Sequence, residues 1–327
     1  MYISFKMRIT YRYLRSAALL LAVVATLTLT SCQMENTSPD AGILRETSLT
    51  IEATMELPYT ETKTTLDDAW NVYWTPKDAI SLFYGLEGEN GGSKFTSTIT
   101  TPSLRSAFTG TIGAVTGVGE VSAEDLMFWG LYPYDATSSF DGQSVMVTMP
   151  SQQTGMADSF APGMAPTLGR APGLLLSFKS IYTGLDISVT EAGYQSITLR
   201  TRSGEPIAGR ARVGWVDNAP KVLDFVSGQT TSEVTLTAPT SAGFEPGKKY
   251  YIQFYPVTMS TGFTVEIKSA TKIGTFTNNR ENLTLVRNKI YNILNIDKDS
   301  RTTWTTVPGD KNGQSEPFAI GGNGKWD

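Results

Sequence analysis

Residues 48–57, Ser-Leu-Thr-Ile-Glu-Ala-Thr-Met-Glu-Leu, decide the fold class of this chain. Apolar side chains occupy every second position, and the positions between them are polar. Because successive side chains of a β-strand point to opposite faces, this pattern predicts a strand about 33 Å long with one buried face. The buried face would carry Leu49, Ile51, Ala53, Met55 and Leu57.

Short segments rich in β-branched and aromatic residues recur along the rest of the chain, between turns that contain Gly, Pro and Asp. Such spacing is typical of β-sandwiches, and no helical period competes with it. We therefore predict an all-β protein with two tandem β-sandwich domains of the transthyretin-like or Greek-key type. Further strands are expected at 79–84, 126–132, 144–149, 174–178, 185–189, 196–200, 233–237, 250–255, 263–268 and 289–296.

The domain limits follow from composition. The segment 152–173 is rich in Pro and Gly and has little periodicity, which favours a boundary there. The predicted parts are a signal peptide at 1–31, a lipidated cysteine and tether at 32–47, sandwiches at 48–168 and 172–298, and a tail at 299–327.

The N-terminus has the three parts of a secretory signal. A basic region without acidic residues precedes the apolar run 16–29, which is too short to span a bilayer as a permanent helix. The run closes on Leu29-Thr30-Ser31-Cys32, a lipobox, and Cys32 is the only cysteine of the chain. We expect cleavage before Cys32 and lipidation on it, because two or more acyl chains anchor a protein stably to a membrane.

Composition excludes several classes of function. The chain has no histidine, which removes the commonest general base and zinc ligand, and we expect no catalytic residue, metal or cofactor. Loss of residues 1–31 removes 4 of the 27 basic residues and no acidic one, so 23 basic residues face 31 acidic ones, a net charge of −8. An acidic chain offers no basic stripe for a nucleic acid.

Three further kinds of site were weighed, and the sequence supports each of them only weakly. Trp70, Trp74 and Trp129 could form a platform for sugars, although aromatic residues in strands are more often core. A pair of carboxylates could hydrolyse glycosides, but nothing in the sequence selects such a pair. The loop 85–93 lacks the lysine and the helix of a phosphate-binding loop and is better interpreted as a hairpin loop.

A series of motifs follows the lipobox in a distinctive order, and each of them alone is weak. The motifs are Thr62-Lys63-Thr64, Trp74-Thr75-Pro76-Lys77-Asp78-Ala79-Ile80, Tyr132-Pro133-Tyr134, Pro150-Ser151-Gln152-Gln153-Thr154, Leu176-Ser177-Phe178-Lys179, Pro206-Ile207-Ala208-Gly209, Tyr255-Pro256 and Asn288-Lys289-Ile290-Tyr291. In this order the chain resembles the fimbrillin family, the type V pilins and related lipoproteins of Bacteroidales-type bacteria. One departure is Ser180, where the family often has histidine.

The resemblance implies a mechanism of assembly. A trypsin-like surface protease would remove the first strand together with the lipid, and a strand of the next subunit would fill the space. Lys63 is the only basic residue between 58 and 66, and cutting at the second candidate, Arg45, would leave the strand in place. Donor candidates lie in the tail, at Trp304, Val307, Phe318 and Ile320.

The function implied by the resemblance is that of a fimbrial subunit or a fimbrillin-like surface adhesin. Its partners would be other pilin subunits, the membrane through Cys32 and the surface protease, and its place the outer membrane, the cell surface and the fimbrium. The alternative is a monomeric glycan-binding surface lipoprotein, and a carboxylate-based glycosidase is a weaker one.

Overall fold

The structure, a computed structural model, describes residues 47–56, 73–84, 90–113, 126–161 and 163–307. All of them belong to a unit that runs from Ala41 to Asp327. Apart from one 3-10 turn, η1 (Ile296–Lys298), the regular elements of the described residues are β-strands. The all-β class is therefore confirmed, and no described helix is long and apolar enough to cross a membrane.

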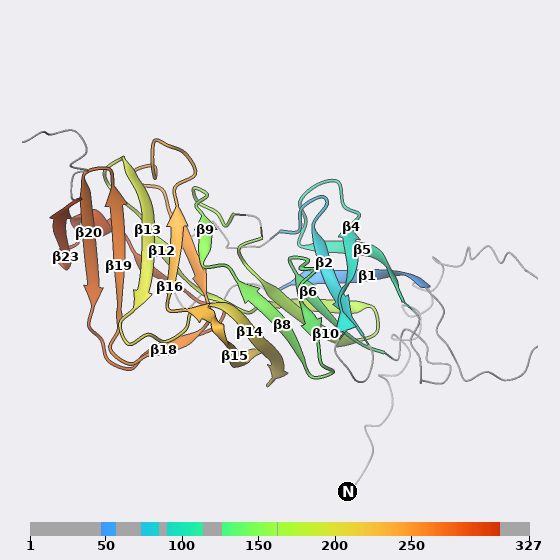
Figure 1. Cartoon of the computed structure of the whole chain (residues 1–327). Helices are drawn as coiled ribbons and strands as arrows, with labels where there is room; N and C mark the ends of the chain where they lie inside the picture. Colours follow the sequence, from blue (N-terminus) through green and yellow to red (C-terminus); the bar gives the residue numbers. More distant parts are fainter. Residues whose placement is uncertain (1–46, 57–72, 85–89, 114–125, 162, 308–327) are drawn as a thin grey trace, which may run out of the picture. The chain divides into compact units, whose positions relative to one another are not determined.

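Seven strands, all from the N-terminal part of the described residues, close into a barrel (Figure 1). Each strand of this barrel pairs with two neighbours, in the order β1-β11-β10-β6-β2-β4-β5, so β5 and β1 meet. The strands are β1 (Thr47–Met55), β2 (Ala79–Phe83), β4 (Ser93–Ser97), β5 (Arg105–Ile112), β6 (Met127–Tyr132), β10 (Thr167–Pro172) and β11 (Leu175–Ser180).

A six-stranded sheet and a three-stranded sheet form most of the C-terminal half of the described residues. The six-stranded sheet has the order β23-β20-β19-β13-β16-β9, with β9 (Gln152–Thr154), β13 (Tyr194–Thr201), β16 (Glu233–Thr237), β19 (Phe263–Ser269), β20 (Lys272–Asn278) and β23 (Thr302–Thr306). The three-stranded sheet contains β12 (Thr183–Ile187), β17 (Tyr250–Phe254) and β22 (Ile290–Ile293).

A five-stranded sheet of order β15-β14-β8-β7-β3 and a pair of short strands complete the described part. The five strands are β3 (Asn90–Gly91), β7 (Ser139–Phe140), β8 (Ser144–Met149), β14 (Ala208–Val216) and β15 (Ala219–Thr231). The pair consists of β18 (Val257–Met259) and β21 (Leu283–Leu285).

The buried apolar side chains form two clusters. The barrel core contains Ile51, Phe108 and Phe178 around Trp74, which is 0% exposed and lies edge-on to both phenylalanines. The larger second core gathers residues from Phe83 to Ile296. Strands such as β5 and β19 alternate between more and less buried residues and so put one face against a core, whereas β12 and β17 are buried at every residue.

The chain passes between these sheets more than once. β8 and β9 pair with β14 and β16 of the C-terminal half, and the next two strands, β10 and β11, return to the barrel. The Pro- and Gly-rich segment 152–173 therefore contains two strands that belong to different sheets. The domain limits given above stay a prediction.

Candidate functional site: the first strand

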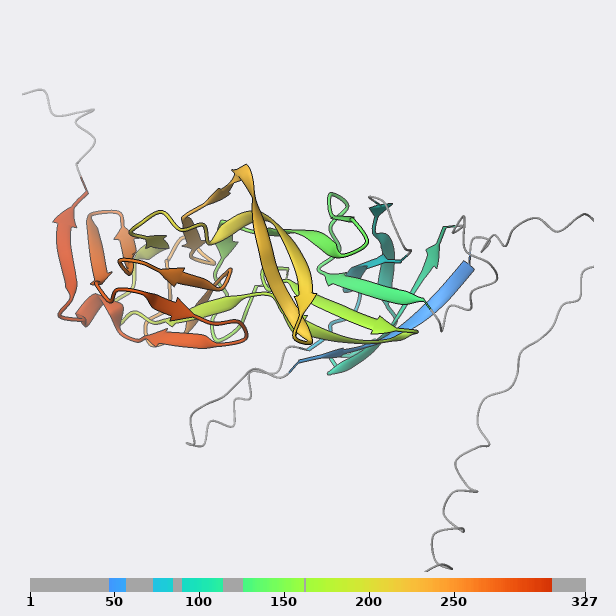
Figure 2. The same ribbon diagram turned by 90° about the horizontal axis from the view of Figure 1, so that it is seen from below.

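The N-terminal strand β1 fills the space between β5 and β11, which we call the β5–β11 slot. Its residues 47–54 pair antiparallel with β5 from Ile112 back to Arg105. Its residues 52–55 pair in parallel with residues 175–178 of β11. Figure 2 shows β1, in blue, alongside the other barrel strands. The strand predicted at 48–57 is thus confirmed over most of its length.

The expected apolar face of β1 points into the barrel. Ile51 and Ala53 are 0% exposed, and Leu49 and Met55 are half-buried against the same core. Ile51 lies directly opposite Phe108 in the register with β5. The intervening residue Glu52 is exposed. Complete burial of an isoleucine side chain stabilises a fold by about 1.5–3 kcal/mol, so β1 contributes strongly to the barrel core.

The C-terminal end of β1 is held by a second set of contacts, at Glu56. Nη2 of Arg287 donates a hydrogen bond of 3.0 Å to Oε1 of Glu56, and Nη1 of Arg287 donates to the other carboxylate oxygen. The backbone N–H of Ser180 also donates to Glu56, at 3.2 Å, and its carbonyl oxygen accepts from Arg287 at 3.1 Å. Both charged side chains are mostly buried, which strengthens such a bidentate pair.

We call Glu56, Arg287 and Ser180 the Glu56 clamp. Tyr182 lies nearby and is 4% exposed, and its burial raises the pKa of its hydroxyl to about 12, with the charge of Glu56 acting in the same direction. The hydroxyl of Ser180, the departure from the family pattern, lies 3.2 Å from Oδ1 of Asn288. Sequence reasoning missed this clamp, because Glu56 looked like one more outward polar residue of an alternating strand.

The second sequence-predicted segment, the tail, is described only in part. Trp304 lies in β23, which pairs antiparallel with β20 at the edge of the six-stranded sheet. Its ring stacks on Tyr194 at 6.1 Å between centroids, and Nζ of Lys272 lies 4.6 Å from its centre. The N–H of Val307 donates to the carbonyl of Thr271 at 3.0 Å. The segment 302–307 is therefore bound to its own chain.

The remaining predicted site residues lie outside the described residues: Leu29, Thr30, Ser31, Cys32, Arg45, Leu57, Lys63, Phe318 and Ile320. Their lipidation, cleavage and donation stay predictions.

The tryptophans do not form the sugar platform that was weighed above. Trp74 is 0% exposed and Trp129 is 4% exposed, so both are core residues, and Trp70 lies outside the described residues. Within the described part of the chain, no group of three or more Cys, Asp or Glu side chains is arranged to hold a metal ion.

No protein-family model matches this chain, and no curated protein does. Several solved structures are similar to it. A "putative cell adhesion protein" from Bacteroides ovatus aligns at 14% identity and a TM-score of 0.46, over 80% of this chain and 96% of the other. A second protein of that description, from Bacteroides uniformis, aligns at 16% identity and a TM-score of 0.45, with the same coverage.

The tip fimbrial protein Mfa3 from Porphyromonas gingivalis aligns at 9% identity and a TM-score of 0.36, over 80% of this chain and 99% of the other. These neighbours are of the kind that the sequence resembles. At such identities and TM-scores, the similarity by itself assigns no function to this chain.

Proposed function

We propose that this protein is a fimbrial subunit or a fimbrillin-like surface adhesin whose first strand is exchanged for a strand of another subunit. One observation carries the proposal. β1 is the first described strand, it completes the barrel between β5 and β11, and it continues into the rest of the chain only through the segment after Glu56. A cut in that segment would leave β1 held by noncovalent contacts alone.

An empty β5–β11 slot would be strongly unfavourable. Loss of β1 would expose the core around Ile51 and leave two strand edges, on β5 and β11, without partners for their backbone N–H and C=O groups. Unpaired edges readily accept another strand, and the main chain of that strand supplies the hydrogen bonds regardless of its sequence. A strand from a second subunit would satisfy both requirements.

The lipid and the protease belong to the same proposal and rest on the sequence. Lipidation of Cys32 would hold the precursor at the outer membrane, with the protein on the cell surface. Cleavage by a trypsin-like surface protease at Lys63 would release β1 and the lipid together, whereas cleavage at Arg45 would release the lipid only. Lys63 is therefore the site that allows exchange.

The donor strand would come from the tail of another subunit, which makes other pilin subunits the partners. Because the segment 302–307 is already paired with β20 and Trp304 is stacked on Tyr194, its release would cost these contacts. We therefore favour the later segment, with Phe318 and Ile320, as the donor. We propose no enzymatic activity and no cofactor, since the chain has no histidine and a single cysteine.

The proposal is tested on the mature protein with residues 1–31 removed. Limited trypsin treatment should cut at Lys63, and the cut protein should form a ladder of polymers that survive mild detergent on a gel. Lys63→Gln is the matched control, because it keeps the length and polarity of the segment and removes the trypsin site. This variant should stay monomeric under the same treatment.

Two further results decide the outcome. A synthetic peptide of residues 47–56 in excess should cap the slot and shorten the ladder, because it restores the native pairing with β5 and β11. Monomers that persist after complete cleavage at Lys63 and after removal of the released strand would refute strand exchange.

A further inference from the structure

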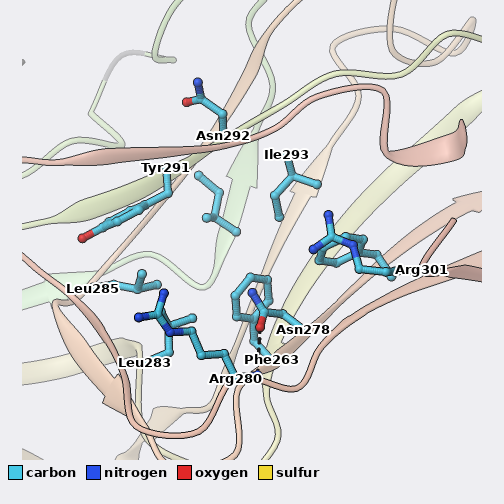
Figure 3. Close-up of a pocket in the computed structure, with 11 residues that line it drawn as sticks. Phe263, Asn278, Arg280, Leu283, Leu285, Tyr291, Asn292, Ile293 and Arg301 are labelled. Carbon is cyan, nitrogen blue, oxygen red and sulfur yellow. Dashed lines mark hydrogen bonds between the residues drawn. The ribbon is translucent and has the colours of Figure 1, made fainter. Parts of the chain in front are cut away.

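A cavity of about 280 Å³ opens between the three-stranded and six-stranded sheets of the C-terminal half (Figure 3). Its floor is apolar and comes from five strands. It consists of Leu185 on β12, Phe263 on β19, Phe276 on β20, Leu285 on β21 and Ile293 on β22. These side chains are each at most 8% exposed. The floor is thus a part of the second core that the cavity leaves uncovered on one side.

The rim of the cavity is positively charged. Arg280 and Arg301 both line it, and no Asp or Glu is among its described lining residues. The whole chain has a net charge of −4, so two arginines at the rim of one cavity stand out from its overall balance. Figure 3 shows the two guanidinium groups on either side of the Phe263 ring in this view.

Arg301 is held in place. Its Nε and Nη2 donate to the carboxylate of Asp299 at 2.9 and 2.7 Å, and its guanidinium carbon lies 4.5 Å from the centre of the Phe276 ring. The pair lowers the pKa of Asp299 to about 2, with the hydrogen bonds from Arg301 as the largest cause. Nη1 of Arg301 is not part of these two hydrogen bonds, but the carboxylate of Asp299 balances the charge of the guanidinium.

Arg280 has no such balance. No described residue accepts a hydrogen bond from its guanidinium or forms an ion pair with it, while its backbone N–H donates to Oδ1 of Asn278 at 3.0 Å. In the other described cavity with an arginine, Arg212 is already paired with Asp141 and Asp224. Among the described residues that line this cavity, Arg280 is therefore the cation whose fork of N–H donors is available to a ligand.

We propose that this cavity binds a small organic anion in which a carboxylate is attached to an apolar body. The carboxylate would accept the paired N–H groups of Arg280, the geometry in which arginine binds carboxylates most strongly. The apolar body would lie on Phe263, Leu285 and Ile293. The cavity volume lies just below the common range of about 300–1,000 Å³ for ligand pockets, which fits a body of about one aromatic ring.

The floor decides between an apolar body and a sugar. A saccharide acid could also reach Arg280, but most of its hydroxyl groups would face Phe263, Leu285 and Ile293, which offer no hydrogen bonds. Burying hydroxyl groups without partners is unfavourable. Apart from the arginines, the polar lining consists of the amides of Asn278 and Asn292 and the hydroxyl of Tyr291. Oδ1 of Asn278 already accepts from the backbone N–H of Arg280 at 3.0 Å, and the Tyr291 oxygen accepts from the N–H of Val286 at 3.1 Å.

The test uses the full mature protein and three probes of similar size, with binding followed by titration calorimetry and ligand-observed NMR. Phenylacetate carries both features, phenylacetamide has the same shape without charge, and glucuronate has the charge on a sugar. Phenylacetate should bind saturably with a Kd below about 10 mM, and phenylacetamide and glucuronate should each bind at least about tenfold more weakly.

Variants locate the site. Arg280→Gln should weaken phenylacetate binding at least about tenfold, and Arg280→Lys should restore part of the affinity, because it keeps the charge but loses the paired donors. Arg200→Gln, at a surface arginine paired with Glu233, is the matched control and should leave binding unchanged. Equal affinity for phenylacetate and phenylacetamide, tighter binding of glucuronate, absence of saturation, or an unchanged Kd in Arg280→Gln would each overturn the proposal.

Discussion

Replacing Ile51 with alanine should strongly destabilise the barrel and accelerate loss of its first strand. Ile51 is 0% exposed, lies opposite Phe108 and belongs to the barrel core. The substitution removes three carbon atoms, which account for roughly 2.4 kcal/mol at about 0.8 kcal/mol each. The cavity left behind adds to this, because close-packed surroundings relax only in part, and the total is expected at about 3 kcal/mol.

The assay is urea unfolding of the mature protein, followed by circular dichroism and tryptophan fluorescence. Thr50→Ala is the matched control, because Thr50 is the neighbouring residue on β1 and is exposed. It should change the free energy of unfolding by no more than about 1 kcal/mol. Ile51→Asp should cost more than Ile51→Ala, because it buries an unpaired charge.

Ile51→Ala should also change the rate at which polymers form after cleavage. Once the segment after Glu56 is cut, β1 leaves the slot against the contacts that it makes there. A loss of about 3 kcal/mol corresponds to a factor of roughly 100 in the affinity of β1 for the slot, since about 1.4 kcal/mol is a factor of ten. Polymers should therefore appear faster in Ile51→Ala. If Ile51→Ala lowered the free energy of unfolding no more than Thr50→Ala does, the docking of β1 described above would be refuted.

Three other perturbations have defined outcomes. Arg287→Ala should lower the free energy of unfolding by about 2–4 kcal/mol, because it leaves Glu56 mostly buried without its cation. A loss below about 0.5 kcal/mol in urea unfolding would argue against the Glu56 clamp. Burial raises the pKa of Asp186, so the folded state binds a proton more tightly than the unfolded state, and stability should fall as pH rises above about 4. Asp186→Asn should remove that decrease when the two proteins are compared in urea from pH 3 to 7, and parallel curves would contradict it. Trp304→Ala should cost only about 1–2 kcal/mol in thermal unfolding, because the ring is 40% exposed, and an unchanged Tm would show that β23 is not anchored by this ring.

Each segment that local sequence predicts as a strand overlaps a strand of the structure, but several other strands were missed, among them β5, β14 and β20. The strands expected at 144–149 and 233–237 are confirmed to the residue. The segment after Trp74 forms one of the expected turns that contain Pro and Asp, with the N–H of Thr75 donating to the Asp78 carboxylate at 2.7 Å. Strand β15 was missed as well, because only one of its thirteen residues is buried and the others show no clear alternation.

The first strand separates what the sequence by itself determined from what the tertiary structure decided. Alternation from Leu49 to Met55 determined that a strand forms there and which face is buried. Successive side chains of a strand point to opposite faces, so both properties can be read from the local order of residues. The choice of β5 and β11 as its neighbours is a matter of pairing between distant segments. The Glu56 clamp depends on Arg287, 231 residues away. Such contacts leave no local pattern, because only the packed fold brings the two groups within hydrogen-bond distance.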